Sequence, residues 1–210
     1  MVMTLKDIGM NHGQQYEVIL TSKNNDGSQN AAPFGTIVKG TNQIVNHIFQ
    51  GSTTLNNILK NKEFMVNITS NPIYFTLAII DNIPSEYYVN KDSLILKDVD
   101  AYFKASVDNT KNFIKKDDPI KPVESTYICS NVSDITKNKS DVITINRGIH
   151  CIIESLVNYS RVDKVKDEKL DYFLGRFNEN SRVINKVGSK QDKEAMKMIK
   201  KSLKNKGYEI

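Results

Sequence analysis

The chain has 210 residues, of which 39% are hydrophobic and 25% charged, and its formal net charge is +5. These values exclude a fibrous or wholly disordered chain and fit one well-buried core, or one domain with a small extension. No apolar run approaches the roughly 18 residues of a membrane span, residues 1–10 lack a signal-peptide pattern, and the two cysteines show no metal-ligand spacing, so a soluble protein of the reducing cytoplasm is expected.

The first part of the chain has the pattern of a β-hairpin. Apolar and polar residues alternate over residues 16–21, and the dipeptide Asp26-Gly27 is a strong turn signal. A second strand is predicted over residues 29–39. Pro33 lies inside this strand and has no N–H to donate, which predicts an edge strand or a bulge at this position.

The middle of the chain alternates strands with short helices. Gly51 separates a predicted strand over residues 44–49 from a helix over residues 53–62, in which apolar residues recur at i, i+3 and i+4. The further predicted elements are a strand at 64–68, a helix at 73–80, and strands at 101–107 and 125–132. Residues 81–98 show no clear pattern. Residues 109–122, which contain Lys115-Lys116-Asp117-Asp118-Pro119, are predicted to form a loop.

The pattern changes after residue 140, where three amphipathic helices are predicted. The first begins near Asn146, and the second places Leu170, Phe173, Leu174 and Phe177 on one face. The third begins at Ser189, where Asp192 completes a variant of the capping box. Gly207 ends the last helix. The sequence therefore predicts a β-rich domain over residues 1–140 and a helical extension over residues 141–210 that packs on it.

Three short segments carry candidate binding chemistry, and each has a plainer structural explanation. Segment Asn30–Thr36, with small residues around a proline, would let a flat ligand approach the backbone, or it is an ordinary edge strand. The turn Gly51–Thr54 precedes a helix whose N-terminal N–H groups could bind an anion, or its hydroxyls only cap that helix. Asn67 needs a polar partner if buried, or it faces solvent.

The order and spacing of these segments resemble the flavin-reductase-like, FMN-binding split-barrel family. That family has an N-x-x-P-F/M strand, an S/R-x-T-L-x-N-I turn and helix, and an E-F-V-V-N strand, which correspond here to Asn30–Phe34, Ser52–Ile58 and Glu63–Asn67. Within it the chain is most similar to the DUF447 domains, whose N-R-G and Y/A-S/T-R stretches match Asn146–Gly148 and Tyr159–Arg161. The likeness spans residues 15–165.

The resemblance implies an α+β fold, in which an antiparallel split β-barrel of the FMN-binding type carries a C-terminal helical extension. It also implies a homodimer with FMN near the dimer interface. The flavin phosphate would meet the turn at Ser52, and the isoalloxazine edge would lie along the strand that contains Pro33. The candidate cofactor-binding residues are Asn30, Ala32, Pro33, Phe34, Gly35, Thr36, Ser52, Thr53, Thr54, Asn67, Arg147 and Arg161.

One departure from the family concerns the charge of the phosphate site. Many flavin reductases place Arg or Lys within the turn, whereas this chain has only Gly, Ser and Thr there. Arg147 and Arg161 are the candidate sources of the missing charge. The alternative is that both arginines form surface or helix-end ion pairs.

The sequence leaves three functions open. The first is an FMN-dependent oxidoreductase that passes electrons from a reduced nicotinamide cosubstrate to an acceptor; the catalytic residues stay unknown, because the cofactor itself carries the redox chemistry. The second is a non-catalytic flavin-binding or assembly protein, with a deazaflavin in place of FMN as a variant. The third, nucleic-acid binding through the lysine-rich residues 186–206, is disfavoured, because this region lacks interleaved aromatic residues and fits a solvated helix face.

Overall fold

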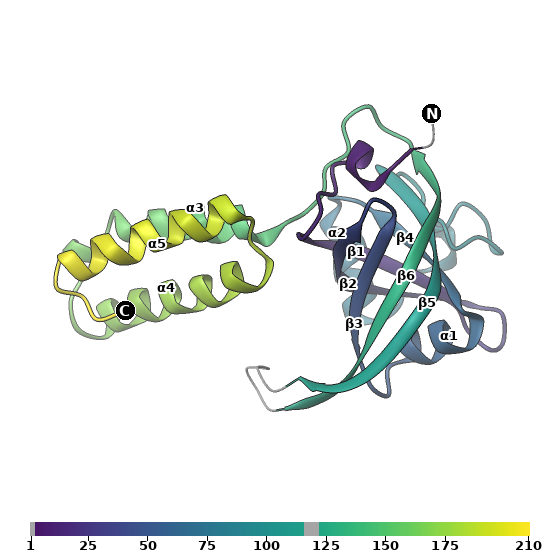
Figure 1. Cartoon of the computed structure of the whole chain (residues 1–210), viewed down its shortest axis with the longest axis horizontal. Helices are drawn as coiled ribbons and strands as arrows, with labels where there is room; N and C mark the ends of the chain where they lie inside the picture. Colours follow the sequence, from purple (N-terminus) through teal and green to yellow (C-terminus); the bar gives the residue numbers. More distant parts are fainter. Residues whose placement is uncertain (1–2, 116–121) are drawn as a thin grey trace. The chain divides into compact units, whose positions relative to one another are not determined.

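Six antiparallel strands close into a barrel (Figure 1). The computed structural model of the protein describes residues 3–115 and 122–210. Around the barrel the strands follow the order β1-β2-β3-β6-β5-β4. They are β1 (Gln15–Lys23), β2 (Gln29–Gly40), β3 (Gln43–Phe49), β4 (Glu63–Ile68), β5 (Ala101–Lys115) and β6 (Val123–Lys137). The predicted fold, an antiparallel barrel with C-terminal helices, is confirmed.

The predicted hairpin at the start of the chain is formed by β1 and β2. The two strands pair continuously from Gln15↔Ile37 to Lys23↔Gln29. Val18 and Leu20 belong to the main core cluster inside the barrel, whereas Ile19 packs in a second cluster beneath α2 (Pro72–Ile80). Strand β1 is therefore buried on both faces, which fixes its register.

Pro33 lies on an edge of the sheet, which is one of the two predicted alternatives. It pairs with Ile19 of β1 without a register shift, so β2 has no bulge at this point. Among the described residues, β3 pairs with β2 only from Thr36 onward. The side of β2 that faces away from β1 has no strand beside it at Pro33, where the missing N–H costs no ladder hydrogen bond.

The long hairpin of β5 and β6 corrects one prediction. The sequence predicts a loop over residues 109–122, but residues 109–115 are the end of β5 and pair with β6 as far as Lys115↔Val123. Residues 108–112 are exposed, so they show none of the apolar alternation by which a half-buried strand is recognised. The rest of the predicted loop, residues 116–121 with Lys116-Asp117-Asp118-Pro119, lies outside the described residues.

Helices α1 (Thr53–Asn61) and α2 flank β4 and agree with their predicted ranges. The segment without a clear pattern follows α2 and contains the short helix η2 (Ser85–Tyr87) and a bridge between Tyr88 and Leu96. Both of these residues are buried in the second cluster. The segment is thus ordered by long-range contacts, which a local sequence pattern does not report.

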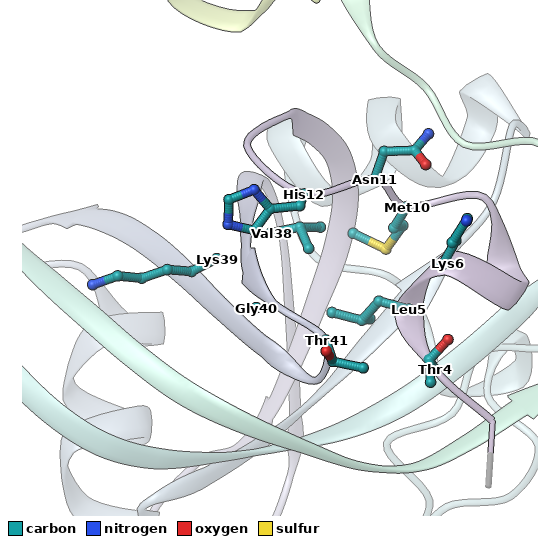
Figure 2. Close-up of a pocket in the computed structure, with 10 residues that line it drawn as sticks. All are labelled: Thr4, Leu5, Lys6, Met10, Asn11, His12, Val38, Lys39, Gly40 and Thr41. Carbon is teal, nitrogen blue, oxygen red and sulfur yellow. The ribbon is translucent and has the colours of Figure 1, made fainter.

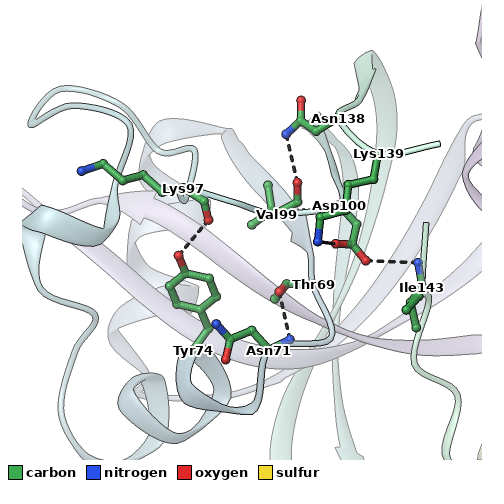
Figure 3. A network of polar contacts seen from close by, with 9 residues as sticks. All are labelled: Thr69, Asn71, Tyr74, Lys97, Val99, Asp100, Asn138, Lys139 and Ile143. Atoms are coloured by element: carbon green, nitrogen blue, oxygen red, sulfur yellow. Dashed lines mark hydrogen bonds and ion pairs between the residues drawn. The ribbon is translucent and has the colours of Figure 1, made fainter. Parts of the chain in front are cut away.

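The chain that leaves β6 is tied back to the start of β5 by a buried carboxylate (Figure 3). Asp100 is 1% exposed; it forms an ion pair with Lys139 and accepts a hydrogen bond from the backbone N–H of Ile143 at 3.2 Å. The side-chain amide of Asn138 donates to the carbonyl of Val99 at 3.0 Å. These contacts hold residues 138–143 against the barrel before the helices begin.

Residues 146–210 form a second compact unit, separate from residues 1–145. Its helices are α3 (Arg147–Tyr159), η3 (Val162–Lys164), α4 (Asp167–Val187) and α5 (Lys190–Asn205). Phe177, Ile184 and Leu203 are fully buried in its core, and Ser189 and Asp192 form the predicted capping box. Packing of this unit on the barrel stays a prediction. In the described part of the chain, no helix is long and apolar enough to cross a bilayer.

Candidate functional site

The predicted phosphate turn is the N-terminus of α1. Gly51 has a φ of 82°, a left-handed conformation that favours glycine, and Ser52 is the N-cap. The Ser52 hydroxyl oxygen accepts from the Leu55 N–H at 3.2 Å, and the Ser52 carbonyl accepts from the Asn56 N–H at 3.1 Å. Capping by Ser52, the plainer explanation, is therefore confirmed.

Capping leaves part of the helix end available for an anion. The N–H groups of Thr53 and Thr54, at the first two helical positions, have no acceptor within the helix. The Ser52 hydroxyl still has its own hydrogen to donate, and Thr53 is exposed. Thr54 is only 3% exposed, so its side chain has a different role. The donor set is neutral and suits phosphate, with the partial positive charge of a helix N-terminus behind it.

A network of amides joins this turn to the edge strand β2. Asn30 donates to the hydroxyl of Thr54 at 2.9 Å and to that of Ser22 at 3.3 Å. Asn57 of α1 donates to the same Ser22 hydroxyl at 3.2 Å and to Asn24 at 2.8 Å. The structure therefore brings two of the three predicted segments together. Asn30 and Thr54 act in this contact as positioning residues.

The edge of β2 next to this network is held by a side chain in place of a strand. The Asn82 amide accepts from the Ala31 N–H at 3.1 Å and donates to the Gln29 carbonyl at 2.8 Å. Beyond Ala31, the half-buried residues Ala32, Pro33, Phe34 and Gly35 continue the edge. A flat ligand could meet the backbone there, because no strand covers this side of β2 among the described residues.

Three further predictions fall on this strand and on β4. A Cβ at Gly35 would lie 2.1 Å from Nε2 of Gln15, so a larger residue would displace that side chain. Thr36 is fully buried, and its hydroxyl accepts from Asn46 at 2.7 Å. Asn67 is also fully buried; it donates to Thr21 at 3.0 Å and accepts from the Leu96 N–H at 2.9 Å. Asn67 thus pins the segment after α2, and a ligand role for it stays a prediction.

The two candidate arginines lie in the helical unit. Arg147 is the first residue of α3, and Arg161 follows the end of that helix. The hydrogen-bonded Arg182 guanidinium and, to a smaller extent, Arg147 hold the pKa of the Glu179 carboxylate below its usual range. Arg147 therefore acts electrostatically on a carboxylate within its own unit, and an ion pair of either arginine stays a prediction. Contact of either arginine with the phosphate turn stays a prediction.

A cation that the sequence did not single out is Lys115, at the end of β5, which lies over Phe49 of β3. Its Nζ lies 5.6 Å from the ring centroid of Phe49, which is three residues before Ser52. Sequence reasoning missed it because residues 109–122 read as a loop. The long-strand pairing of β5 with β6 and of β6 with β3 is what brings Lys115 to Phe49.

A cavity of about 390 Å³ lies elsewhere on the barrel, between the short helix η1 (Leu5–Ile8) and the turn from β2 to β3 (Figure 2). None of the predicted site residues lines it. Its polar side chains do not converge, because Lys6 and Lys39 point in different directions (Figure 2). The candidate site therefore remains the α1 N-terminus with the β2 edge.

Comparison with protein families gives matches over most of the chain. A model described as "Protein of unknown function (DUF447) N-terminal domain" matches residues 16–134. A second model, "Protein of unknown function (DUF447)", matches residues 146–201. An uncharacterized protein of Methanocaldococcus jannaschii is 24% identical over 193 residues, which are 89% of this chain and 97% of that protein.

Comparison with solved structures also gives matches. An FMN-bound protein of Methanosarcina mazei, also assigned to DUF447, is 24% identical to this chain with a TM-score of 0.54. The match covers 95% of this chain and 100% of that protein. The flavin reductase of styrene monooxygenase from Pseudomonas putida S12 is 14% identical with a TM-score of 0.46, over 60% of this chain and 81% of its own.

Proposed function

Because the chain belongs to the DUF447 family, we propose that it binds FMN and passes electrons from a reduced nicotinamide nucleotide through the flavin to an acceptor. The observation that carries flavin binding is the Asn30–Thr54 hydrogen bond, which fixes the open N-terminus of α1 beside the uncovered edge of β2. The M. mazei protein, whose fold this chain shares, is FMN-bound. Electron transfer rests on the resemblance to flavin reductases.

The residues present fit FMN in two parts. The Thr53 and Thr54 N–H groups and the Ser52 and Thr53 hydroxyls would hold the phosphate. The backbone of β2 around Pro33 would bond the polar edge of the ring system, with Asn30 keeping the two parts in register. Bound FMN supplies hydride and electron transfer, and the chain supplies position and electrostatics.

A homodimer is part of this proposal. Helix α2 ends in Ile79 and Ile80, which are 72% and 78% exposed. Two residues further along the chain, Asn82 hydrogen-bonds the edge of β2 at Ala31. Exposed aliphatic side chains next to a binding edge are typical of a surface that another chain covers. Sedimentation of the purified protein tests this part, and a monomer at micromolar concentration would contradict it.

The absorption spectrum of the purified protein is the first test of flavin binding. We expect flavin bands as purified or after addition of FMN, and oxidation of NADH or NADPH by the loaded protein. Colourless protein that retains no FMN would sink the proposal. Retention of FMN without nicotinamide oxidation would favour the second candidate, a non-catalytic flavin-binding protein, and a shifted band would indicate a deazaflavin.

A charge change at the helix cap separates phosphate binding from capping. Asp caps helices as well as Ser, so Ser52→Asp keeps the stability of α1 but sets a negative charge against the phosphate. We expect wild-type thermal stability and loss of FMN binding. Asn71→Asp, at the N-cap of α2, where the side-chain oxygen accepts from the Ile73 N–H, is the matched control, for which FMN affinity stays unchanged. FMN binding by Ser52→Asp at wild-type affinity would place the phosphate elsewhere.

A further inference from the structure

Aromatic rings gather on the outer face of three neighbouring strands, β3, β6 and β5. The register places His47 opposite Tyr127 and Tyr127 opposite Lys111. The His47 ring lies 5.3 Å from that of Phe113, edge to face, and 5.6 Å from that of Tyr127. The cavity between them measures about 380 Å³. It is lined by His47, Asn109, Lys111, Phe113 and Tyr127, which we call the His47 face.

The charges around the His47 face are mainly positive. Lys111 lines the cavity, and Lys39 donates to the Tyr127 hydroxyl at 2.8 Å from the rim. The hydrogen bond with Tyr127 raises the pKa of Lys39, which keeps its ammonium protonated. The lining residues include no carboxylate; that of Asp108 accepts a hydrogen bond from Asn109 at 2.9 Å at the edge of the group.

We propose that the His47 face binds a free nucleotide, with its base in the cavity and packed against the rings of His47, Tyr127 and Phe113, and its phosphate paired with Lys111 and Lys39. Aromatic side chains on an exposed sheet offer a stacking surface to any planar base, and lysines beside them supply the phosphate contact. His47 and Lys111 are exposed and lie outside the core clusters, so their side chains are accessible to a ligand.

The size of the face favours a single nucleotide over a nucleic-acid strand. A cavity of about 380 Å³ lies within the range of small-ligand pockets. Strand-binding surfaces instead stack successive bases along a continuous basic groove. A reduced nicotinamide dinucleotide contains an adenine nucleotide, the group that the His47 face would bind. His47 is next in sequence to Asn46, which pairs with Thr36 of β2, the strand proposed to hold the flavin ring. The inference goes beyond flavin binding and stands without it.

Calorimetric titration of the full-length protein with ADP tests the proposal, with and without excess FMN. We expect saturable binding that His47→Ser, Tyr127→Ser and Lys111→Ser each weaken by about tenfold, the usual loss for one stacking or phosphate contact. Tyr127→Phe keeps the ring and should retain binding. Lys91→Ser and Tyr172→Ser, which remove an exposed lysine and an exposed tyrosine elsewhere, are the controls and should bind as the wild type does.

Four outcomes would overturn the proposal. The first two are that the protein shows no saturable ADP binding, or that His47→Ser, Tyr127→Ser and Lys111→Ser bind ADP with wild-type affinity. The third is that these variants change their oligomeric state in sedimentation, and the fourth is that the protein prefers oligothymidylate to ADP. The third would make the face a protein interface, and the fourth a strand-binding surface. Thermal melts identify any variant that fails to fold. In that case Lys111→Ser, which changes only an exposed side chain, still decides the result. Colourless protein that binds ADP would contradict only the flavin proposal.

Discussion

At the residue scale, two buried tyrosines of the barrel unit differ in whether their hydroxyl groups form a hydrogen bond. Tyr74 and Tyr88 belong to the same cluster beside α2. The Tyr74 hydroxyl donates to the Lys97 carbonyl at 2.7 Å (Figure 3). The Tyr88 hydroxyl is buried and has no partner among the described residues. Burial raises the pKa of Tyr88 far above its usual value, so this side chain stays neutral.

This pair predicts opposite effects of removing one oxygen atom. Tyr88→Phe removes an unsatisfied polar atom, so the free energy of unfolding should stay the same or rise by up to about 1 kcal/mol. Tyr74→Phe leaves the Lys97 carbonyl without its partner and should lower it by about 1 kcal/mol. Urea unfolding of both variants checks this. A loss of stability in Tyr88→Phe as large as that in Tyr74→Phe would show that the Tyr88 hydroxyl has a partner, such as a buried water.

Asn30 carries the second residue-scale prediction, because its amide joins the two parts of the candidate site. Asn30→Ala removes its donors to Thr54 and Ser22 and should lower the free energy of unfolding by about 1–2 kcal/mol. It should also weaken FMN binding, because the α1 N-terminus loses its tie to β2. Asn56→Ala, on the exposed face of α1, is the control and should change neither quantity. An FMN affinity unchanged in Asn30→Ala would separate the network from the site.

At the element scale, helix ends could be predicted well and strand lengths less well. Ser52, Asn146 and Ser189 each begin a helix with a side-chain cap, as local sequence signals indicate. The end of β5 could not be predicted, because exposed residues 108–112 carry no apolar alternation and are held as a strand only by pairing with β6.

The candidate site shows the same limit. Order and spacing indicated which segments matter, and the family expectation is confirmed. The Asn30–Thr54 contact spans 24 residues, and the contact of Asn67 with Leu96 spans 29, so no local pattern could report either. The position of Lys115 could not be predicted either, because its contact with Phe49 depends on the pairing of β5 with β6 and of β6 with β3.

The end of α5 gives an element-scale prediction that depends on pH. Asp163 accepts from Lys206, with which it forms an ion pair, and from the Tyr208 hydroxyl at 2.9 Å. These hydrogen bonds hold the pKa of Asp163 below its ordinary value of 3.8. Because the folded pKa is the lower one, the contribution to stability is complete above pH 3.8 and is lost as the pH falls through the folded value.

Asp163→Asn tests this contribution. We expect a slightly lower Tm than that of the wild type at neutral pH, since exposed ion pairs contribute little, and a difference that shrinks as the pH falls below 3.8. Asp171→Asn, at an exposed position of α4, should show a much smaller difference at every pH. A Tm difference for Asp163→Asn that stays the same at every pH would mean that the substitution acts through packing and not through the charge.

At the scale of the whole molecule, the question is which unit supplies the positive charge that the phosphate turn lacks. Lys115 belongs to the same unit as the turn and lies over Phe49, whereas Arg147 and Arg161 belong to the helical unit, where Arg147 acts on Glu179. Strand β3, which contains Phe49, leads directly into the turn, so this lysine is held on the strand that precedes the candidate phosphate site. We therefore expect Lys115 to contribute more to FMN binding than either arginine.

Neutral replacements decide between the two units. Lys115→Gln should raise the Kd for FMN by about tenfold, the value of one charge-assisted phosphate contact, and should reduce the salt dependence of binding. Arg147→Gln and Arg161→Gln should bind FMN as the wild type does, while Arg147→Gln raises the pKa of Glu179, measurable by NMR. The reverse result, with FMN lost in an arginine variant and kept in Lys115→Gln, would show that the helical unit completes the flavin site, and the two units would then act as one binding structure.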